Sequence, residues 1–263
     1  MDSYEHNRQS WNELTILHAE SDFYDLASFK KGKTSLNQIE MEELGDVKGK
    51  KLLHLQCHFG MDTLSLAKEG AEVVGIDISD TSIQKAKELS NKLDIPAKFF
   101  RSNIYDLENV LNRRFDIIYT SYGAINWLSD LGSWAKIINR YLKPGGIFYM
   151  IEFHPFIYTL NKNSEIANSY FKTKPIESFV KRSYTDKSEV FYEDLKHIEW
   201  HHSLSEVLNS LISNGLIIEF LNEFPYQVYN CFPNLIEIES GKWVSAKYKD
   251  SIPHMYSIKA RKV

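Results

Sequence analysis

Short apolar segments alternate with helix-like segments from Lys50 onward, and this alternation constrains the fold more than any other feature of the chain. Residues 50–56 and 71–77 are strand-sized apolar runs, and the segment between them ends at Gly70. Glycine commonly follows the last turn of a helix. Strands that alternate with helices build parallel βαβ units. The pattern therefore predicts an α/β fold with a doubly wound sheet.

The alternation continues with strand-like residues 97–103, 115–122 and 147–153. Before the last of these, apolar residues recur at helical spacing, and residues 143–146 stop that helix and turn the chain. Ser203 and Glu206 form a capping-box pattern ahead of another helix. Residues 216–224 and 254–262 read as strands with no helix between them, which favours an antiparallel pair. We expect a mostly parallel seven-stranded sheet, helices on both faces and an antiparallel last strand.

Two segments fall outside this alternation, and both are rich in aromatic residues. We expect residues 1–45 to form an N-terminal helical cap and residues 46–263 to form the main domain, with a substrate-cap insertion at about 155–202. Loops at the carboxyl ends of the strands are where such folds bind ligands. The two segments are predicted to close over that site. The alternative is that their aromatic residues fill a second small core.

The loop after the first strand, residues 56–60, is predicted to meet a nucleoside. The helix that follows it offers a favourable N-terminus to a negative group. Asp77 ends the second strand, 21 residues after Gln56. An acidic residue at about this spacing can accept hydrogen bonds from ribose hydroxyls. A strand, turn, helix, strand and acid in this order favours a nucleoside site.

Five motifs, taken in order, resemble those of class I (Rossmann-like) S-adenosylmethionine-dependent methyltransferases. The first reads LLHLQCHFG, where the family usually has a sequence close to LLDLGCGTG, and the second reads VVGIDIS. The third to fifth are RSNIYDL, FDIIYTSYGAINWL and LKPGGIFYM. The resemblance is clear from Lys50 to Phe153 and weaker beyond. It implies S-adenosylmethionine as the cofactor and methyl transfer as the reaction.

The resemblance also implies the residues that meet the cofactor, with Asp77 on the ribose and Asn103 near adenine. The predicted set is Gln56, Cys57, His58, Gly60, Asp77, Ile78, Asn103, Ile104, Ser121 and Tyr122. The chain departs from the family at His54, which replaces an aspartate, and at Gln56 and His58, which replace glycines. Either the backbone avoids positive φ at these two positions, or their side chains touch the ligand. Cys57 is expected to be a small packed residue.

Methyl transfer requires mainly the orientation of two reactants. A general base is needed only when the acceptor carries a proton to lose. The candidates are Glu152 and His154, at the end of the fifth strand, and His202, before the capped helix; each could instead be structural. The aromatic residues predicted to line the substrate pocket are Trp11, Tyr24, Trp127 and Trp200. No His/Cys set has the spacing of a metal site, so no metal is expected.

Charge and composition restrict the partners. The net charge is −4 and the basic residues are scattered, whereas a nucleic-acid enzyme needs a basic face. We therefore expect a small-molecule acceptor and no nucleic acid. No apolar run has the length of a membrane span, and the first residues are too polar for a signal peptide. With only two cysteines, the chain is expected in the cytoplasm. Nothing indicates the oligomeric state.

Two other functions are compatible with a βαβ pattern. An NAD-dependent oxidoreductase would carry G-x-G-x-x-G after the first strand, but the chain has QCHFGM there. A nucleoside-binding protein of the same fold, without turnover, would be compatible with the altered first motif. Measuring turnover separately from cofactor binding distinguishes that protein from an enzyme.

Overall fold

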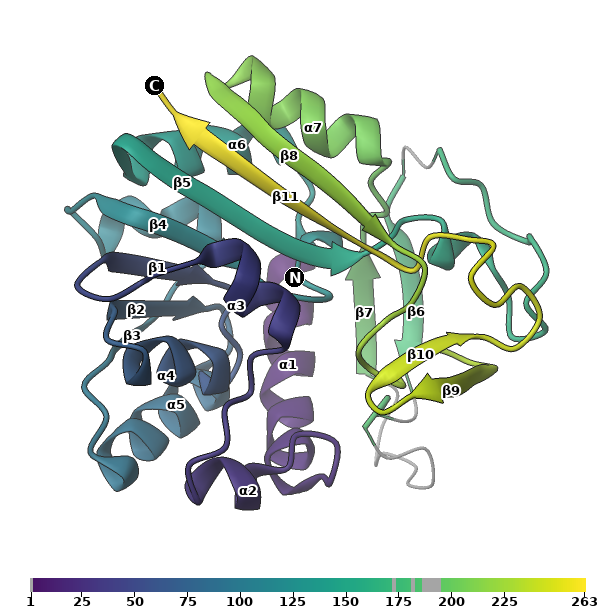
Figure 1. Ribbon diagram of the computed structural model, residues 1–263, viewed down its shortest axis with the longest axis horizontal. Coiled ribbons are helices and arrows are strands. Elements are labelled where there is room, and N and C mark those ends of the chain that lie inside the picture. The colour runs from purple at the N-terminus through teal and green to yellow at the C-terminus, as the bar shows by residue number, and fades with distance from the viewer. Residues whose placement is uncertain (1, 172–173, 181–182, 186–194) are drawn as a thin grey trace.

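A seven-stranded sheet forms the centre of the molecule, in a computed structural model that describes residues 2–171, 174–180, 183–185 and 195–263 (Figure 1). The strand order is β3-β2-β1-β4-β5-β11-β8. The last strand, β11, is antiparallel to both β5 and β8, and the other neighbours are parallel. The strands of this sheet are β1 (Lys51–Leu55), β2 (Glu72–Asp77), β3 (Lys98–Arg101), β4 (Phe115–Thr120), β5 (Leu142–Phe153), β8 (Leu216–Phe224) and β11 (Met255–Lys262). The predicted fold class is confirmed.

Helices cover both faces of the sheet because successive residues of each strand point to opposite sides. Leu53 belongs to the core under α6, α7 and the 3₁₀ helix η1, whereas Leu52 belongs to the core under α3. Cys57 and Phe99 belong to a third core between α4 and α5. The helices are α1 (Ser3–Glu20), α2 (Leu26–Lys30), α3 (Gln38–Leu44), α4 (Met61–Lys68), α5 (Asp80–Leu93), α6 (Leu131–Tyr141) and α7 (Leu204–Ser213), with 3₁₀ helices η1 (Ile104–Asn109), η2 (Ile125–Trp127) and η3 (Ile157–Thr159).

Helix α6 ends at Tyr141 as predicted, and the turn at residues 143–146 is an irregularity inside β5, where the pairing with β4 passes from Leu142 to Ile147 and Gly145 has a φ of 74°. Strand β5 begins at Leu142, directly after the helix, and residues 143–146 lie within the strand. Leu142 is fully buried and pairs with Phe115 of β4, which starts the strand early. The predicted capping box of α7 is also as expected, with Ser203 and Glu206 bonding each other's backbone.

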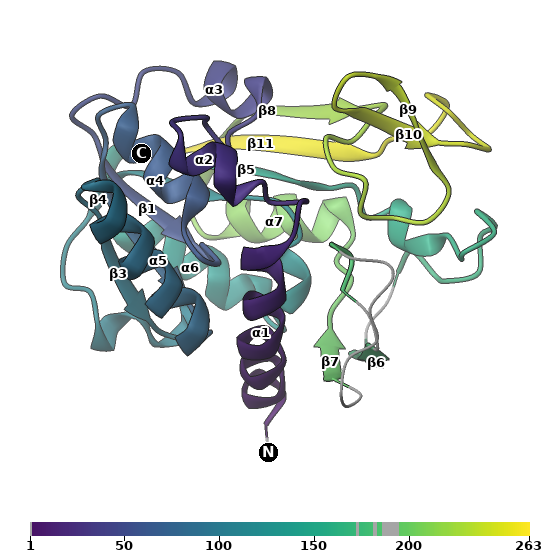
Figure 2. The ribbon, with the colours of Figure 1, turned by 90° about the horizontal axis from the view of Figure 1, so that it is seen from below.

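Two small antiparallel sheets, which the sequence pattern did not indicate, extend the fold. One pairs β6 (Ile176–Val180) with β7 (Leu195–Glu199), and the other pairs β9 (Leu235–Glu239) with β10 (Lys242–Ser245). Figure 2 shows both small sheets beyond the same end of β5 and β8. The β8–β11 connection, expected only as a long loop, is therefore a second structured insertion at the carboxyl edge of the sheet.

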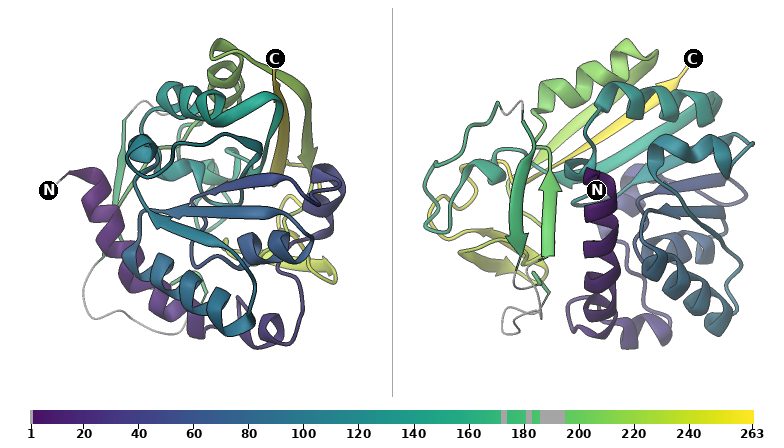
Figure 3. Two further views of the ribbon diagram at one scale, coloured as in Figure 1. Left: turned by 90° about the vertical axis from the view of Figure 1, so that its left-hand side faces the viewer. Right: turned by 180° about the vertical axis from the view of Figure 1, so that it is seen from behind.

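Helix α1 lies between the main sheet and the β6–β7 pair (Figures 1 and 3). It contacts α5 on one side and β7 on the other. Its buried residues are mostly polar, namely Asn7, Ser10, Leu14, Thr15 and His18. Buried polar groups need partners, so this helix is held by specific hydrogen bonds as well as by apolar packing.

Candidate functional site

A cavity of about 660 Å³ opens where β1, β2 and β4 end. Its floor comes from the loops after these strands, as expected for a doubly wound sheet. Its walls come from three other parts of the chain: residues 4–37, the insertion after β5 and the β8–β11 connection. The predicted cap segments therefore both line the cavity, and a third segment joins them. That these segments move to close over a bound ligand remains a prediction.

The loop after β1 has positive φ at the two positions where the family has glycine. Gln56 has φ 56° and His58 has φ 50°, so the backbone does not avoid the left-handed region. Each side chain is held by a hydrogen bond. Gln56 Nε2 donates to the carbonyl oxygen of Ala124 at 2.7 Å, and His58 Nε2 lies 2.8 Å from His18 Nδ1. These contacts offset the strain of the left-handed backbone, which costs roughly 1–2 kcal/mol per residue.

Gly60 has a packing role that the motif alone does not reveal. Its φ is 82°, and a Cβ added there would lie 2.8 Å from the ring of Phe99. The glycine thus lets α4 start close to β3 and α5. Cys57 is 4% exposed beside the same core, and burial raises the pKa of its thiol well above the usual value. A protonated, enclosed thiol is a poor nucleophile.

Asp77 ends β2 with its carboxylate at the cavity. Its two oxygens accept the backbone N–H groups of His58 and Ser79, each at 2.8 Å. Burial raises the pKa of Asp77 to about 6, while these N–H groups act in the opposite direction. The carboxylate is therefore fixed in direction, and it is ionised at neutral pH with lone pairs left for a ligand.

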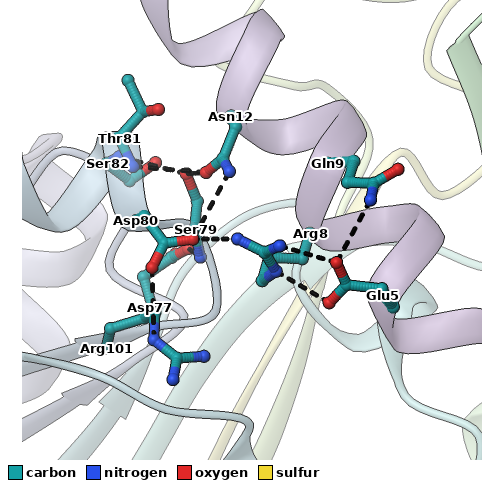
Figure 4. Close-up of polar contacts among 10 residues, drawn as sticks. All are labelled: Glu5, Arg8, Gln9, Asn12, Asp77, Ser79, Asp80, Thr81, Ser82 and Arg101. Atoms are coloured by element: carbon teal, nitrogen blue, oxygen red, sulfur yellow. Dashed lines mark hydrogen bonds and ion pairs between the residues drawn. The ribbon is translucent and has the colours of Figure 1, made fainter.

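Helix α1 is bonded to the start of α5 next to Asp77 (Figure 4). Asn12 Oδ1 accepts from the hydroxyl of Ser79 at 2.7 Å and from the backbone N–H of Thr81 at 3.2 Å. Arg8 forms an ion pair with Asp80. The N-terminal segment is thus connected to the residues that orient Asp77, and not only to the outer surface of the cavity.

The other predicted cofactor residues also line the cavity. They are Ile78, Asn103, Ile104, Ser121 and Tyr122. Asn103 uses its side-chain oxygen to accept the backbone N–H of Tyr105 at 3.2 Å, as the N-cap of η1. The structure therefore brings together the complete cofactor set that the motifs implied. Contact of each residue with the cofactor remains a prediction.

Glu152 is placed differently from the prediction of a general base. It is 1% exposed, does not line the cavity, and accepts the backbone N–H groups of Gly123, Ala124, Ile125 and Phe153. Burial raises its pKa, and the four N–H groups lower it. Its carboxylate shapes the loop after β4, so its geometry is that of a positioning residue.

His154 and His202 also face away from the cavity, which argues against both as bases. His154 Nε2 lies 3.0 Å from Glu223, and its Nδ1 accepts the backbone N–H of Phe156 at 3.1 Å. His202 Nε2 lies 2.7 Å from the carbonyl oxygen of Leu128, to which it donates. Neither lines the cavity, so both histidines anchor loops.

Three of the four predicted pocket aromatics line the cavity, and Trp200 does not. Its ring stacks on Tyr4 at 6.0 Å between centroids, and its backbone N–H donates to Asn126. Trp11 and Trp127 meet edge to face at 5.2 Å, forming part of the wall. The prediction for Trp200 is therefore corrected, because its ring packs on Tyr4, which lines the cavity, and does not itself line it.

Several lining residues were not among the individually predicted site residues. They include Asn37, Asp62, Tyr158, His197 and Tyr229. Asp62 could have been predicted from the sequence, because it lies two positions after Gly60, in the first turn of α4. His197 and Tyr229 lie in the two insertions, whose path over the sheet no periodicity reveals. Within the residues described, no group of three or more His, Cys, Asp or Glu is arranged to hold a metal ion.

Residues 46–210 match the family described as "Methyltransferase domain". An uncharacterised methyltransferase from Synechocystis is 31% identical over 47% of this chain and 56% of its own length. A ubiquinone biosynthesis O-methyltransferase from Alkalilimnicola ehrlichii is 28% identical over 46% of this chain and 45% of its own length. The chain spans about half the length of these curated relatives.

Solved structures share the fold over nearly the whole chain. An S-adenosylmethionine-dependent methyltransferase from Mesorhizobium loti has a TM-score of 0.55 at 21% identity, covering 89% of this chain and 100% of that one. Another from Clostridium acetobutylicum has a TM-score of 0.57 at 16% identity, covering 94% of both chains. No helix among the described residues is both long and apolar enough to cross a membrane.

Proposed function

This chain belongs to the class I S-adenosylmethionine-dependent methyltransferases, and we propose that its cavity binds the cofactor against Asp77. We also propose that a small-molecule acceptor binds in the same cavity, beneath the aromatic residues of the N-terminal segment and the two insertions. The observation that carries the proposal is the lining of this cavity. It contains the loop after β1, the end of β2, and aromatic residues from three segments that lie far apart in the sequence.

The residues at the cofactor end fit the group chemically. The Asp77 carboxylate has accepting capacity for ribose hydroxyls. Gln56 contributes a buried Oε1 that has no hydrogen-bond partner among the described residues, which fits a donor group on a ligand. Asp62 holds a hydrogen bond from the Ser35 hydroxyl at 2.6 Å, and burial raises its pKa. A carboxyl group at this end of the cavity suits the cofactor's ammonium group.

The cofactor, when bound, supplies an activated methyl group on a sulfonium. The residues of this chain then orient the acceptor and exclude water. The acceptor end supports a small molecule: the cavity is enclosed by the N-terminal segment and both insertions, and the net charge of −4 does not favour a nucleic acid. We also propose a cytoplasmic location, which the low cysteine content favours.

The test separates binding from turnover. Calorimetric titration of the full chain with S-adenosylhomocysteine should give micromolar-range affinity, and NAD should not compete. Incubation with S-adenosylmethionine and a metabolite library should release S-adenosylhomocysteine with one or more acceptors. Binding of NAD in place of the methyl donor would contradict the cofactor site. Cofactor binding without turnover across the library would favour the nucleoside-binding alternative.

A further inference from the structure

His197, in the middle of β7, lines the cavity with a ring nitrogen that the described residues leave without a hydrogen-bond partner. It is 7% exposed and lines the cavity. Its Nε2 is buried and has no hydrogen-bond partner among the described residues. Its ring meets Trp127, on the loop after β4, edge to face at 5.1 Å. An unpaired buried polar atom costs about 1–3 kcal/mol, so such an atom in a cavity points to a bound partner.

The backbone around His197 is held on both sides. Asn7 of α1 bonds the backbone N–H and carbonyl of the next residue, Ile198, at 2.9 and 2.8 Å. On the other side, β7 pairs with β6, and Ser178 lies opposite His197. A side chain on a strand fixed in this way has a defined direction toward the cavity, which positioned proton transfer requires.

Charge in the cavity restricts what His197 can meet. Lys33 is the one cationic side chain among the described lining residues, and it pairs with Asp25 at 3.2 Å. No lining arginine or second lysine is described that could balance a phosphate or a carboxylate on the acceptor. The ring of Trp127 instead meets those of Trp11 and His197, and Phe153, Tyr158 and Tyr229 add further aromatic rings to the lining of the same cavity. Aromatic faces suit a flat and neutral body.

We propose that His197 is the catalytic base for an acceptor that is an aromatic hydroxyl. This inference rests on the proposed function and adds the substrate class to it. The hydroxyl oxygen forms a bond to the methyl carbon while the carbon–sulfur bond breaks and its electron pair stays on sulfur. The hydroxyl proton passes to His197 Nε2. The products are a methyl ether, a neutral thioether and an imidazolium, so atoms and charge balance.

The presence of a base favours a hydroxyl oxygen over an alkyl amine as the acceptor atom. Burial lowers the pKa of His197 to about 4, so the imidazole is neutral at pH 7 and a weak base. Attack by a hydroxyl makes its proton strongly acidic, and a weak base then removes it. A neutral alkyl amine attacks through its lone pair and needs no base, because its ammonium product keeps the proton or releases it to solvent, so a base in the cavity serves a hydroxyl and not an amine.

The first experiment measures the protonation state and hydrogen bonding of the His197 imidazole. In the full chain bound to S-adenosylhomocysteine, ¹⁵N NMR of histidine should report His197 as neutral, with the proton on Nδ1. Adding phenol or 2-naphthol should move the Nε2 resonance upfield as that atom accepts a hydrogen bond, and His197→Gln identifies the signal. A proton on Nε2, or no response to either hydroxyl probe, would overturn the proposal.

The second experiment measures turnover with matched probes: phenol and 2-naphthol against benzylamine and benzoate. Only the hydroxyl probes should give methylated products by mass spectrometry. His197→Gln keeps a hydrogen-bond acceptor but cannot take the proton, so kcat should fall about 10²–10⁴-fold with a much smaller change in KM. His6→Gln, on α1 and outside the cavity lining, is the matched control and should leave kcat unchanged.

The possible outcomes distinguish the proposed function from the proposed substrate class and from the role of His197 as the base. Failure of the wild-type chain to bind S-adenosylhomocysteine would contradict the proposed function itself. Binding with methylation of benzylamine or benzoate, or with no methylation of either hydroxyl probe, would overturn the substrate class alone. A His197→Gln variant that binds S-adenosylhomocysteine normally and turns over like the wild type would overturn the base.

Discussion

Asn7 forms two hydrogen bonds with the backbone of Ile198, 191 residues later in the chain. Its Nδ2 donates to the carbonyl oxygen at 2.8 Å, and its Oδ1 accepts from the N–H at 2.9 Å. The side chain thus occupies the position of a neighbouring strand along β7. Asn7 thus helps the N-terminal helix to hold the strand that carries His197.

We expect Asn7→Ala to lower the free energy of unfolding by about 1–3 kcal/mol, because it leaves a buried backbone N–H and carbonyl unpaired. Urea denaturation measures the change, and faster proteolytic cleavage of α1 should accompany it. Gln9→Ala, at an exposed site on the same helix, is the control and should change stability by less than about 0.5 kcal/mol. Equal effects of the two variants would show that the pairing with Ile198 contributes little.

Asp77 should make cofactor binding depend on pH. Its pKa is raised from 3.8 to about 6 in the folded protein, so the folded state holds this proton more tightly than the unfolded state. The stability contribution is therefore complete below about pH 4 and is lost as the pH rises toward 6. Bound ribose hydroxyls favour the ionised form, so S-adenosylhomocysteine affinity should fall as the pH drops below about 6.

Calorimetric titrations from about pH 5 to about pH 8 check this dependence. Asp77→Asn should bind more weakly by roughly 1.5–3 kcal/mol at neutral pH and show a flatter profile. Asn103→Ala should cost less, because the adenine ring keeps stacking and backbone contacts. A profile for Asp77→Asn that superimposes on the wild type would remove this carboxylate from the ribose site.

The left-handed backbone at Gln56 can be measured with two substitutions. Gln56→Ala and Gln56→Gly both remove the hydrogen bond to Ala124. Only glycine also removes the steric cost of φ 56°. The glycine variant should therefore be more stable than the alanine variant by about 1 kcal/mol in urea denaturation. The reverse order would mean that the extra freedom of the unfolded glycine chain outweighs the strain.

Glu152→Gln should destabilise the protein by about 2 kcal/mol, because an amide donor would oppose one of the backbone N–H groups that the carboxylate now accepts. Cofactor affinity should fall as well, since Gly123 and Ala124 line the cavity. Glu223→Gln, at a half-exposed site on β8, is the comparison and should cost less. Unchanged stability and affinity in Glu152→Gln would contradict a positioning role.

Glu40 should make stability fall at alkaline pH. It is fully buried, its Oε2 has no hydrogen-bond partner among the described residues, and burial raises its pKa from 4.5 to about 8. Its stability contribution is complete below 4.5 and is lost as the pH rises through about 8. Thermal unfolding should therefore show Glu40→Gln more stable than the wild type at about pH 9. The exposed Glu42→Gln should follow the wild type, and a Glu40→Gln curve parallel to both would contradict the assignment.

The sequence alone predicted the sheet, because burial of a strand and of a helix face each leaves a local period in the residues. The same local information predicted a cofactor site, and the structure places its predicted residues around one cavity. Strand ends place the loop from Gln56 to Gly60 and Asp77 at one edge, and Asn103 follows from the next strand. These residues are close together because the connections of the parallel strands bring successive carboxyl ends to the same side.

Which residues line the proposed acceptor end of the cavity depends on the tertiary structure. His154 and Glu152 follow β5 as the pattern suggested, yet their neighbours turn one toward Glu223 and the other into the backbone of the loop after β4. His197 and Tyr229 reach the cavity from two insertions whose paths depend on contacts such as that of Asn7 with Ile198. Periodicity records only which face of an element is buried. Contacts between distant segments leave no period, so only the folded chain shows that His197 lines the cavity and that His154 and His202 do not.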